Sequence, residues 1–304
     1  MSGFFARKSL ETMFQEAEEK EGGLRRALGP VQLTALGIGA IIGAGIFVLS
    51  GLGAHTYAGP ALTLSFIVSG LGCAFAAFCY AEFAAMIPLS GSAYTYAYAT
   101  LGELFAWIIG WDLVLEYAMG ASTVSSGWSN HVVVFLRDVG IKLPLWLSYD
   151  PWTAARKAAQ MGVPFDGPTI FGWQFAWNVP ATLIVLLITA VLAIGIRESS
   201  SLNAVIVAIK VSVVLFVIFI GLRYINSDNW GSDWKGFAPY GLGGIWEGAA
   251  YIFFAYIGFD AVSTTAQEVK NPQRDLPIAI LASLGICTVL YVAVAGILTG
   301  MVPY

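Results

Sequence analysis

The first apolar segment of this chain, GIGAIIGAGIF at residues 37–47, carries four glycines within nine residues. Glycine costs roughly 1 kcal/mol relative to alanine inside a helix. In a bilayer, no water is present to satisfy backbone groups that leave the helical hydrogen-bond pattern. A membrane helix that breaks at this point therefore indicates that something binds to the freed backbone groups.

The composition places the chain in a membrane. Of its 304 residues, 58% are hydrophobic and 11% are charged, whereas soluble domains carry about 25% charged residues. The sequence has no basic stripe of the kind that binds nucleic acid, so nucleic acid is not expected as a partner. The cysteines show no CxxC spacing and the two histidines are far apart, so neither a metal site nor a disulfide framework is expected. We expect no cofactor, and we expect a lipid bilayer as the surroundings.

Seven apolar stretches can be interpreted as membrane spans, because a bilayer needs about 20 residues per helix. They cover residues 31–53, 60–86, 104–134, 179–196, 202–222, 246–266 and 277–302. The third is longer than a bilayer requires, so we expect it to end in a turn outside the membrane. Residues 89–103 are small and aromatic, which favours a short interfacial helix.

The loops indicate how the chain is oriented. Arg7, Lys8, Lys20, Arg25 and Arg26 precede the first span, which favours a cytoplasmic N-terminus in the plasma membrane. Residues 1–30 lack an apolar core, so no cleaved signal peptide is expected. The longest connection is an outer loop at about 137–178, and we expect its four tryptophans to lie at the membrane interface. These are Trp146, Trp152, Trp173 and Trp177.

The sixth span is also interrupted, since FFAYIGFD at residues 253–260 places a glycine and an aspartate near its middle. Transporters built from inverted repeats break corresponding helices of their two halves and bind substrate at the breaks. Spans one to five would form a first repeat at 31–223, after a cytoplasmic segment at 1–30. Spans six and seven would begin a second repeat at 246–304. We therefore expect this chain to be the N-terminal portion of a longer transporter.

Three stretches resemble the amino acid–polyamine–organocation superfamily, and within it the cationic amino acid transporter group. GIGAIIGAGIFVLSG resembles the first-span signature of this family. The stretch that begins GPALTLSFIVSG resembles its second and third spans, and FFAYIGFDAVSTTAQEVKNPQRDLPIAI resembles its sixth span and the start of its seventh. The resemblance implies an all-α integral membrane protein with the LeuT-like five-plus-five inverted repeat. This chain would hold its first seven spans, with helices 1 and 6 broken.

The expected substrate is an amino acid, because a broken helix offers partners to both charges of a zwitterion. Helix N-termini attract carboxylates and helix C-termini attract ammonium groups. We expect the amides of Gly43, Ala44 and Gly45 to bind the carboxylate. The carbonyl groups expected to face the ammonium belong to Ile41, Phe254, Ala255 and Ile257. The resemblance implies the same assignment, although the glycines could instead serve only close helix packing.

Two further residues beside the second break have alternative roles. Phe254 is expected to cover the bound substrate as a gate, or else to be a core or lipid-facing aromatic residue. Asp260 either caps the inner half-helix or faces a basic side chain in the substrate pocket. Ala44 lies where many members of the family carry serine or threonine, so an amide contact is possible there and a hydroxyl contact is not.

Lys210 lies in the fifth span, roughly 12 Å beyond Leu202 at 1.5 Å per residue. An ionisable group inside the membrane is a functional hypothesis by default. In proton-coupled members of the fold, a lysine near the first span replaces a cation, and AIK at 208–210 resembles that pattern. The resemblance therefore implies proton coupling, whereas the alternative is a charged strut held by backbone carbonyls. Glu116, four residues after Asp112 on the third span, is a weaker candidate to receive the proton; a bond to a neighbouring helix is its alternative.

The sequence thus predicts a secondary active transporter of amino acids that works by proton symport. A seven-helix receptor or sensor is the alternative from another class of protein. An enzyme is not expected, because the chain contains no HExxH, no GxSxG and no Cys/His pair with a base. The sequence does not determine which amino acids are carried, or whether a small accessory membrane subunit binds.

Overall fold

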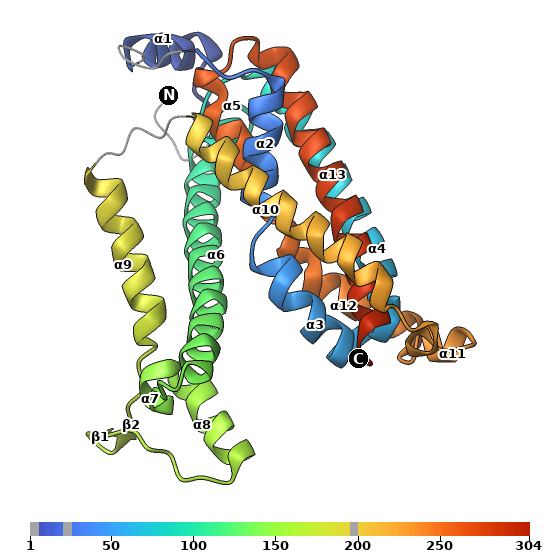
Figure 1. The fold of residues 1–304 in the computed structure, drawn as a ribbon. Coiled ribbons are helices and arrows are strands. Elements are labelled where there is room, and N and C mark those ends of the chain that lie inside the picture. Colours follow the sequence, from blue (N-terminus) through green and yellow to red (C-terminus); the bar gives the residue numbers. More distant parts are fainter. Residues whose placement is uncertain (1–5, 21–25, 195–199) are drawn as a thin grey trace. The chain divides into compact units, whose positions relative to one another are not determined.

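The computed structural model describes residues 6–20, 26–194 and 200–304, and most of these are helical (Figure 1). The α-helices are α1 (Leu10–Lys20), α2 (Pro30–Ile41), α3 (Ser50–Gly53), α4 (Leu62–Met86), α5 (Ser92–Thr100), α6 (Glu103–Asp138), α7 (Leu145–Ser148), α8 (Pro151–Met161), α9 (Val179–Ile194), α10 (Ser200–Gly221), α11 (Trp234–Phe237), α12 (Gly241–Ile252) and α13 (Pro272–Met301). Short 3-10 or π-helical segments are η1 (Gly45–Leu49), η2 (Ala54–Ala58), η3 (Gly59–Ala61), η4 (Leu222–Tyr224), η5 (Ser227–Trp230), η6 (Phe253–Tyr256) and η7 (Asp260–Glu268). Strands β1 (Thr169–Ile170) and β2 (Trp173–Gln174) pair antiparallel.

Five helical stretches among the described residues are long and apolar enough to cross a membrane. They are Gly45–Met86, Glu103–Asp138, Ala204–Tyr224, Trp234–Glu268 and Pro272–Met301. Two other apolar helices, Pro30–Ile41 and Val179–Val191, are shorter. The structure is therefore that of a multi-pass membrane protein, with five long and two short apolar helices where seven spans were expected.

The stretch Gly45–Met86 contains a sharp turn at Gly59. Gly59 has φ 58° and ψ −145°, and a Cβ there would lie 2.6 Å from the ring of Pro239, so only glycine fits. Helical turns continue as far as Ala58, beyond the expected end of the first span at residue 53. Hydropathy marks where the chain leaves the lipid, whereas the turn marks where the helix ends.

The third span is one continuous helix of 36 residues, α6 (Glu103–Asp138). Residues 128–138 contain neither glycine nor proline, so nothing in this part of the sequence interrupts the helical hydrogen bonds. The helix therefore continues beyond the expected end of the span at about residue 134, and the turn follows Asp138. The short helix expected within residues 89–103 is α5 (Ser92–Thr100).

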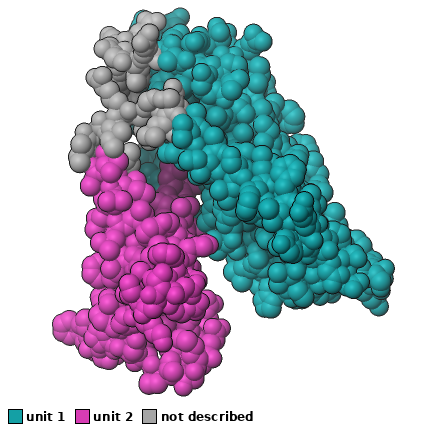
Figure 2. Space-filling view, in the orientation of Figure 1, with its two compact units in different colours: residues 1–114, 198–304 teal, residues 115–197 magenta. Residues whose placement is uncertain are grey.

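The described chain forms two compact units (Figure 2). Unit 1 comprises residues 1–114 and 198–304, and unit 2 comprises residues 115–197. Within unit 1, α13 packs along α4 and α2, α12 packs on α4, and α10 packs on α2 (Figure 1). Unit 1 therefore contains both interrupted spans and the helices that surround them.

Within unit 2, the connection at 137–178 is ordered by its own small core. Tyr149 and Ala154 form this core with Ala176, and Trp146 packs against it. Asp150 caps α8, because its carboxylate accepts a hydrogen bond from the Thr153 amide (3.0 Å). Trp152 and Trp173 are mostly exposed, so the tryptophans of this loop differ in how far they pack on the protein.

A backbone bridge joins the start of the first span to the end of the sixth. The amides of Ala27 and Leu28 donate to the Glu268 carbonyl (2.9 and 3.0 Å), and the Lys270 amide donates to the Leu28 carbonyl (3.0 Å). At the start of α2, the Gly29 amide also donates to the side-chain oxygen of Gln32 (3.0 Å). The two interrupted spans are thus tied together at this end as well as at their breaks.

Candidate functional site

The first interruption follows α2. This helix ends at Ile41, and Ile42 is extended (φ −72°, ψ 104°). Ala44 then has helical angles (φ −60°, ψ −23°), and η1 begins at Gly45. The last carbonyls of a helix have no donors within their own helix, and the first amides of the next helix have no acceptors. Such groups are available for partners other than the helix itself.

The second interruption lies between η6 and η7. Ile257 is extended (φ −55°, ψ 136°), and Gly258 has φ 110°, an angle that residues with a Cβ rarely adopt. A Cβ on Gly258 would also lie 2.9 Å from the Ala40 carbonyl oxygen. A Cβ on Gly45 would lie 2.6 Å from Ala255 Cα. The two interruptions therefore pack directly on each other, backbone against backbone.

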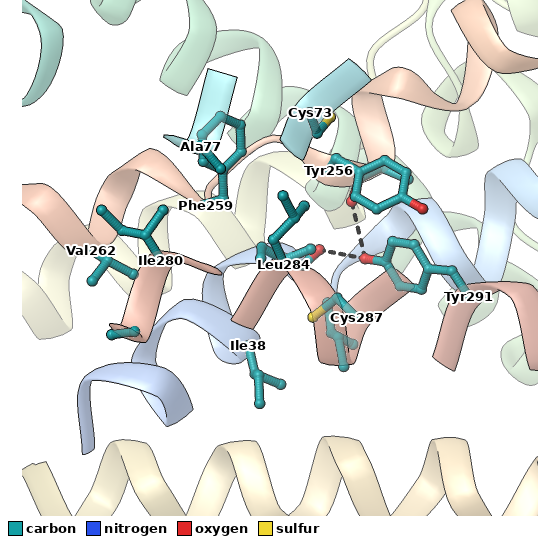
Figure 3. Close-up of a cluster of buried hydrophobic side chains, with 14 of the residues drawn as sticks. Ile38, Cys73, Ala77, Tyr256, Phe259, Val262, Ile280, Leu284, Cys287 and Tyr291 are labelled. Atoms are coloured by element: carbon teal, nitrogen blue, oxygen red, sulfur yellow. Dashed lines mark hydrogen bonds between the residues drawn. The ribbon is translucent and has the colours of Figure 1, made fainter. Parts of the chain in front are cut away.

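Tyr291 on α13 bridges the two interruptions. Its Oη lies 2.8 Å from the Ile41 carbonyl oxygen and 3.0 Å from the Ala255 carbonyl oxygen, and its side chain is fully buried (Figure 3). A phenol has one proton to donate, so the two carbonyls share it, and each keeps a second lone pair. Two carbonyls that were expected to face an ammonium group thus lie within reach of one hydroxyl.

Tyr291 was not predicted as a site residue. The signal in the sequence is a single phenol within the apolar run ICTVLYVAVAG of the seventh span. A buried tyrosine hydroxyl usually has a hydrogen-bond partner, so this position predicts a polar contact inside the bundle. The sequence does not show which carbonyls that contact reaches.

Lys210 on α10 binds the end of α2. Its Nζ donates to the carbonyls of Gly39 (3.0 Å) and Ile42 (3.2 Å), and its side chain is partly buried. A positive charge is favoured at the C-terminal end of a helix, where the carbonyls point outwards. This geometry fits both hypotheses for Lys210. In the first the lysine exchanges a proton, and in the second it is a charged strut held by backbone carbonyls.

Phe254 and Ile257 lie beside the second interruption and are partly buried, as are Gly43 and Ala44 beside the first. The Phe254 carbonyl accepts a hydrogen bond from the Ile257 amide (3.3 Å), so one of its two lone pairs is used within the turn. The Ala255 carbonyl makes its bond outside the turn, to Tyr291. The two neighbouring carbonyls are therefore not equivalent.

Asp260 is 3% exposed and contacts the short helix α5. Its Oδ2 accepts a hydrogen bond from Ser92 Oγ (3.1 Å), and its backbone carbonyl accepts one from Ser263 Oγ (2.6 Å). Phe259 occupies the N-cap position of η7, so the interpretation of Asp260 as the cap of this helix is wrong. The contact with Ser92 was not predicted, because it depends on how α5 packs on the sixth span.

Glu116 belongs to unit 2. Its side chain is partly buried along α6, and the argument for its role in proton transfer rests on its place in the sequence. Within the described parts of the chain, no group of three or more His, Cys, Asp and Glu side chains could hold a metal ion.

Comparison with known proteins places the chain in a family. A family model described as amino acid permease matches residues 28–304. The methylthioribose transporter of Bacillus subtilis (strain 168) is 47% identical over 304 residues, covering 100% of this chain and 61% of the relative. The branched-chain amino acid permease BcaP of the same organism is 49% identical over 300 residues, covering 99% and 60%. The vacuolar cationic amino acid transporter 4 of Arabidopsis thaliana is 38% identical over 306 residues, covering 100% and 48%.

The chain thus spans about half to three-fifths of the length of these relatives. The matched region includes both interruptions, α10 and α13, which are the elements that form the candidate site. A permease family and relatives named as transporters give no support to the receptor alternative or to an enzyme. The chain belongs to the amino acid permease family.

Proposed function

We propose that this chain forms the substrate-binding part of a secondary active transporter that carries amino acids by proton symport. The main support for this proposal is the Tyr291 bridge, in which the carbonyls of Ile41 and Ala255 lie within hydrogen-bond distance of the same hydroxyl. The amides of Gly43, Ala44 and Gly45 follow at the start of the next helical segment. A zwitterion needs carbonyls for its ammonium and amides for its carboxylate at this spacing.

The remaining residues of the proposed site take the roles expected from the sequence. Phe254 covers the substrate, and the Ile257 carbonyl is a further partner for the ammonium group. Asp260 begins η7, directly after the second interruption, where it can act on the substrate pocket through the polar contact with Ser92. In this proposal the first repeat covers 31–223 and the second begins at 246, as in the LeuT-like fold.

Lys210 supplies the proposed proton coupling. A protonated amine makes charge-assisted hydrogen bonds to the carbonyls of Gly39 and Ile42, and such bonds are about twice as strong as neutral ones. Both carbonyls belong to the stretch that leads into the first interruption. The charge on Lys210 therefore acts on the backbone that holds the substrate. Glu116 is proposed as a second group that exchanges protons.

Uptake by the full-length protein in liposomes tests this function. Radiolabelled isoleucine, arginine and alanine are compared with methylthioribose, because relatives are named for branched-chain amino acids, cationic amino acids and methylthioribose. We expect at least one amino acid to accumulate under an inward proton gradient and to be lost when a protonophore is added. Accumulation of methylthioribose alone would contradict the amino acid substrate. Accumulation that resists the protonophore would contradict symport.

The orientation and location of the protein are part of the proposal. We place it in the plasma membrane with a cytoplasmic N-terminus, although one plant relative is named for the vacuole. Labelling of an added N-terminal tag in intact and permeabilised cells tests the orientation, and labelling of intact cells would contradict it.

Changing Tyr291 to phenylalanine is expected to raise the KM for uptake about tenfold. The carbonyls of Ile41 and Ala255 lose their shared donor, and an unsatisfied buried polar group costs about 1–3 kcal/mol. Tyr240→Phe is the matched control, since its phenol donates to the His55 carbonyl (3.1 Å) at an exposed position. The concentration dependence of initial uptake gives the KM of both variants. A lower KM in Tyr291→Phe would instead show that the phenol competes with the substrate ammonium group.

A further inference from the structure

Tyr256 lies at the end of η6 and is fully buried, and its hydroxyl finds its hydrogen-bond partner outside the sixth span. Its Oη donates to the Phe66 carbonyl in α4 over 2.9 Å. The rings of Phe66 and Tyr256 also meet edge to face, with centroids 6.3 Å apart. The unwound part of the sixth span is therefore attached to the second span by a directional bond.

Helix α4 leaves room for this hydroxyl at Gly70, one turn after Phe66. A Cβ on Gly70 would lie 3.1 Å from Tyr256 Oη and 2.9 Å from Thr288 Cγ2. Both distances are shorter than ordinary van der Waals contacts. Glycine at this position thus keeps the path from the phenol to the Phe66 carbonyl open.

The segment that carries Tyr256 has few bonds of its own. η6 is a 3-10 turn of four residues, followed by extended Ile257 and by Gly258 at positive φ. Such a turn lacks the continuous hydrogen bonds of an α-helix. The place of the Ala255 carbonyl therefore depends on the side chains that anchor the turn from outside.

Two anchors act on neighbouring residues of η6. Tyr256 fixes the turn to α4, while Tyr291 on α13 takes the Ala255 carbonyl (3.0 Å). The rings of Tyr256 and Tyr291 pack together with centroids 5.3 Å apart (Figure 3). The centroid of the Phe66 ring lies 5.4 Å from that of the Tyr291 ring. A shift of the Tyr256 ring is thus transmitted to both the turn and the bridge.

We propose that Tyr256 is a positioning residue for substrate binding. It sets the place of the Ala255 carbonyl by holding η6 on α4, and it does not touch the substrate itself. This inference rests on the proposed function for its effect on uptake, while its effect on the backbone of η6 is independent of any substrate.

The test compares Tyr256→Phe with Tyr240→Phe in the full-length protein. Each change removes one hydroxyl that donates to a backbone carbonyl, but only Tyr256 lies at the site. For Tyr256→Phe we expect the KM for uptake to rise about fivefold, the factor of one net hydrogen bond, with the maximal rate changed less than twofold. We also expect faster hydrogen–deuterium exchange of the amides in residues 253–260. Tyr240→Phe should change neither quantity.

A second pair of variants approaches the same contact from α4. Gly70→Ala crowds the Tyr256 hydroxyl together with the Thr288 side chain of α13, whereas a Cβ on Gly72 of the same helix meets nothing within 4 Å. We expect Gly70→Ala to raise the KM and to speed exchange at residues 253–260, and Gly72→Ala to do neither. This pair also gives an answer if Tyr256→Phe fails to fold.

Unchanged KM and unchanged exchange in Tyr256→Phe, with only a lower melting temperature, would show that the phenol serves packing alone and would overturn the inference. If the wild-type protein takes up no amino acid, the proposed function fails. Exchange at residues 253–260 still decides in that case whether Tyr256 holds the turn, so the two failures are distinguishable.

Discussion

Replacing Lys210 with alanine is expected to reduce the proton-driven accumulation of substrate by about a hundredfold. The variant loses two hydrogen bonds from a charged group, to the carbonyls of Gly39 and Ile42, and such bonds contribute about 1.5–3 kcal/mol each. It also loses the group that would exchange a proton beside the first interruption. The measurement is uptake into liposomes with and without an imposed pH gradient.

Lys210→Arg separates the two hypotheses for this residue. Arginine keeps the positive charge but does not release its proton at physiological pH. A coupling lysine predicts that Lys210→Arg binds substrate and exchanges it across the membrane, yet no longer responds to the pH gradient. Full proton-driven accumulation by Lys210→Arg would identify a strut, and full accumulation by Lys210→Ala would contradict any role in coupling.

Replacing Gly45 with alanine is expected to reduce uptake by about ten- to a hundredfold. The added Cβ would lie 2.6 Å from Ala255 Cα, and a clash with a backbone atom is not relieved by rotating a side chain. Overpacking of this kind costs about 1–3 kcal/mol, and here the clash falls between the two interruptions that form the proposed site. Initial uptake rates and the melting temperature measure the effect.

Gly51→Ala is the matched control for Gly45→Ala. Gly51 lies in α3 of the same span, and a Cβ at this position meets nothing within 4 Å. We expect wild-type uptake from this variant and slightly higher stability, because alanine is the better helix former. Wild-type uptake by Gly45→Ala would show that close packing of the two interruptions is not needed for transport.

The sequence predicts best those features that arise from local chemistry. Apolar length identifies the segments that enter a bilayer, and the membrane class follows from them. Lys210 stands out because a charge within an apolar helix is costly wherever that helix packs. The helices do not end where the expected spans end, as Ala58 and Asp138 show, because hydropathy reports the lipid boundary and not the last hydrogen-bonded turn.

The contacts of the site were not predictable in the same way. Tyr291 reaches Ile41 across 250 residues of sequence, and Tyr256 reaches Phe66 across 190. Asp260 meets Ser92 across 168 residues. Nothing near these residues in the sequence indicates their partners, because a hydroxyl bonds to whichever carbonyl the packing of two distant helices brings within about 3 Å.

The sequence alone determined that this chain enters a membrane and that one lysine lies deep in the fifth span. It also determined that the first and sixth spans carry glycines at positions where glycine destabilises a helix. These properties depend only on the transfer of side chains into lipid and on the missing Cβ of glycine. Only the tertiary structure decided that Tyr291 joins Ile41 to Ala255, that Tyr256 holds the turn on α4, and that Lys210 points to Gly39 and Ile42. The reason is physical, since hydrogen bonds act over about 3 Å and depend on which helices pack together.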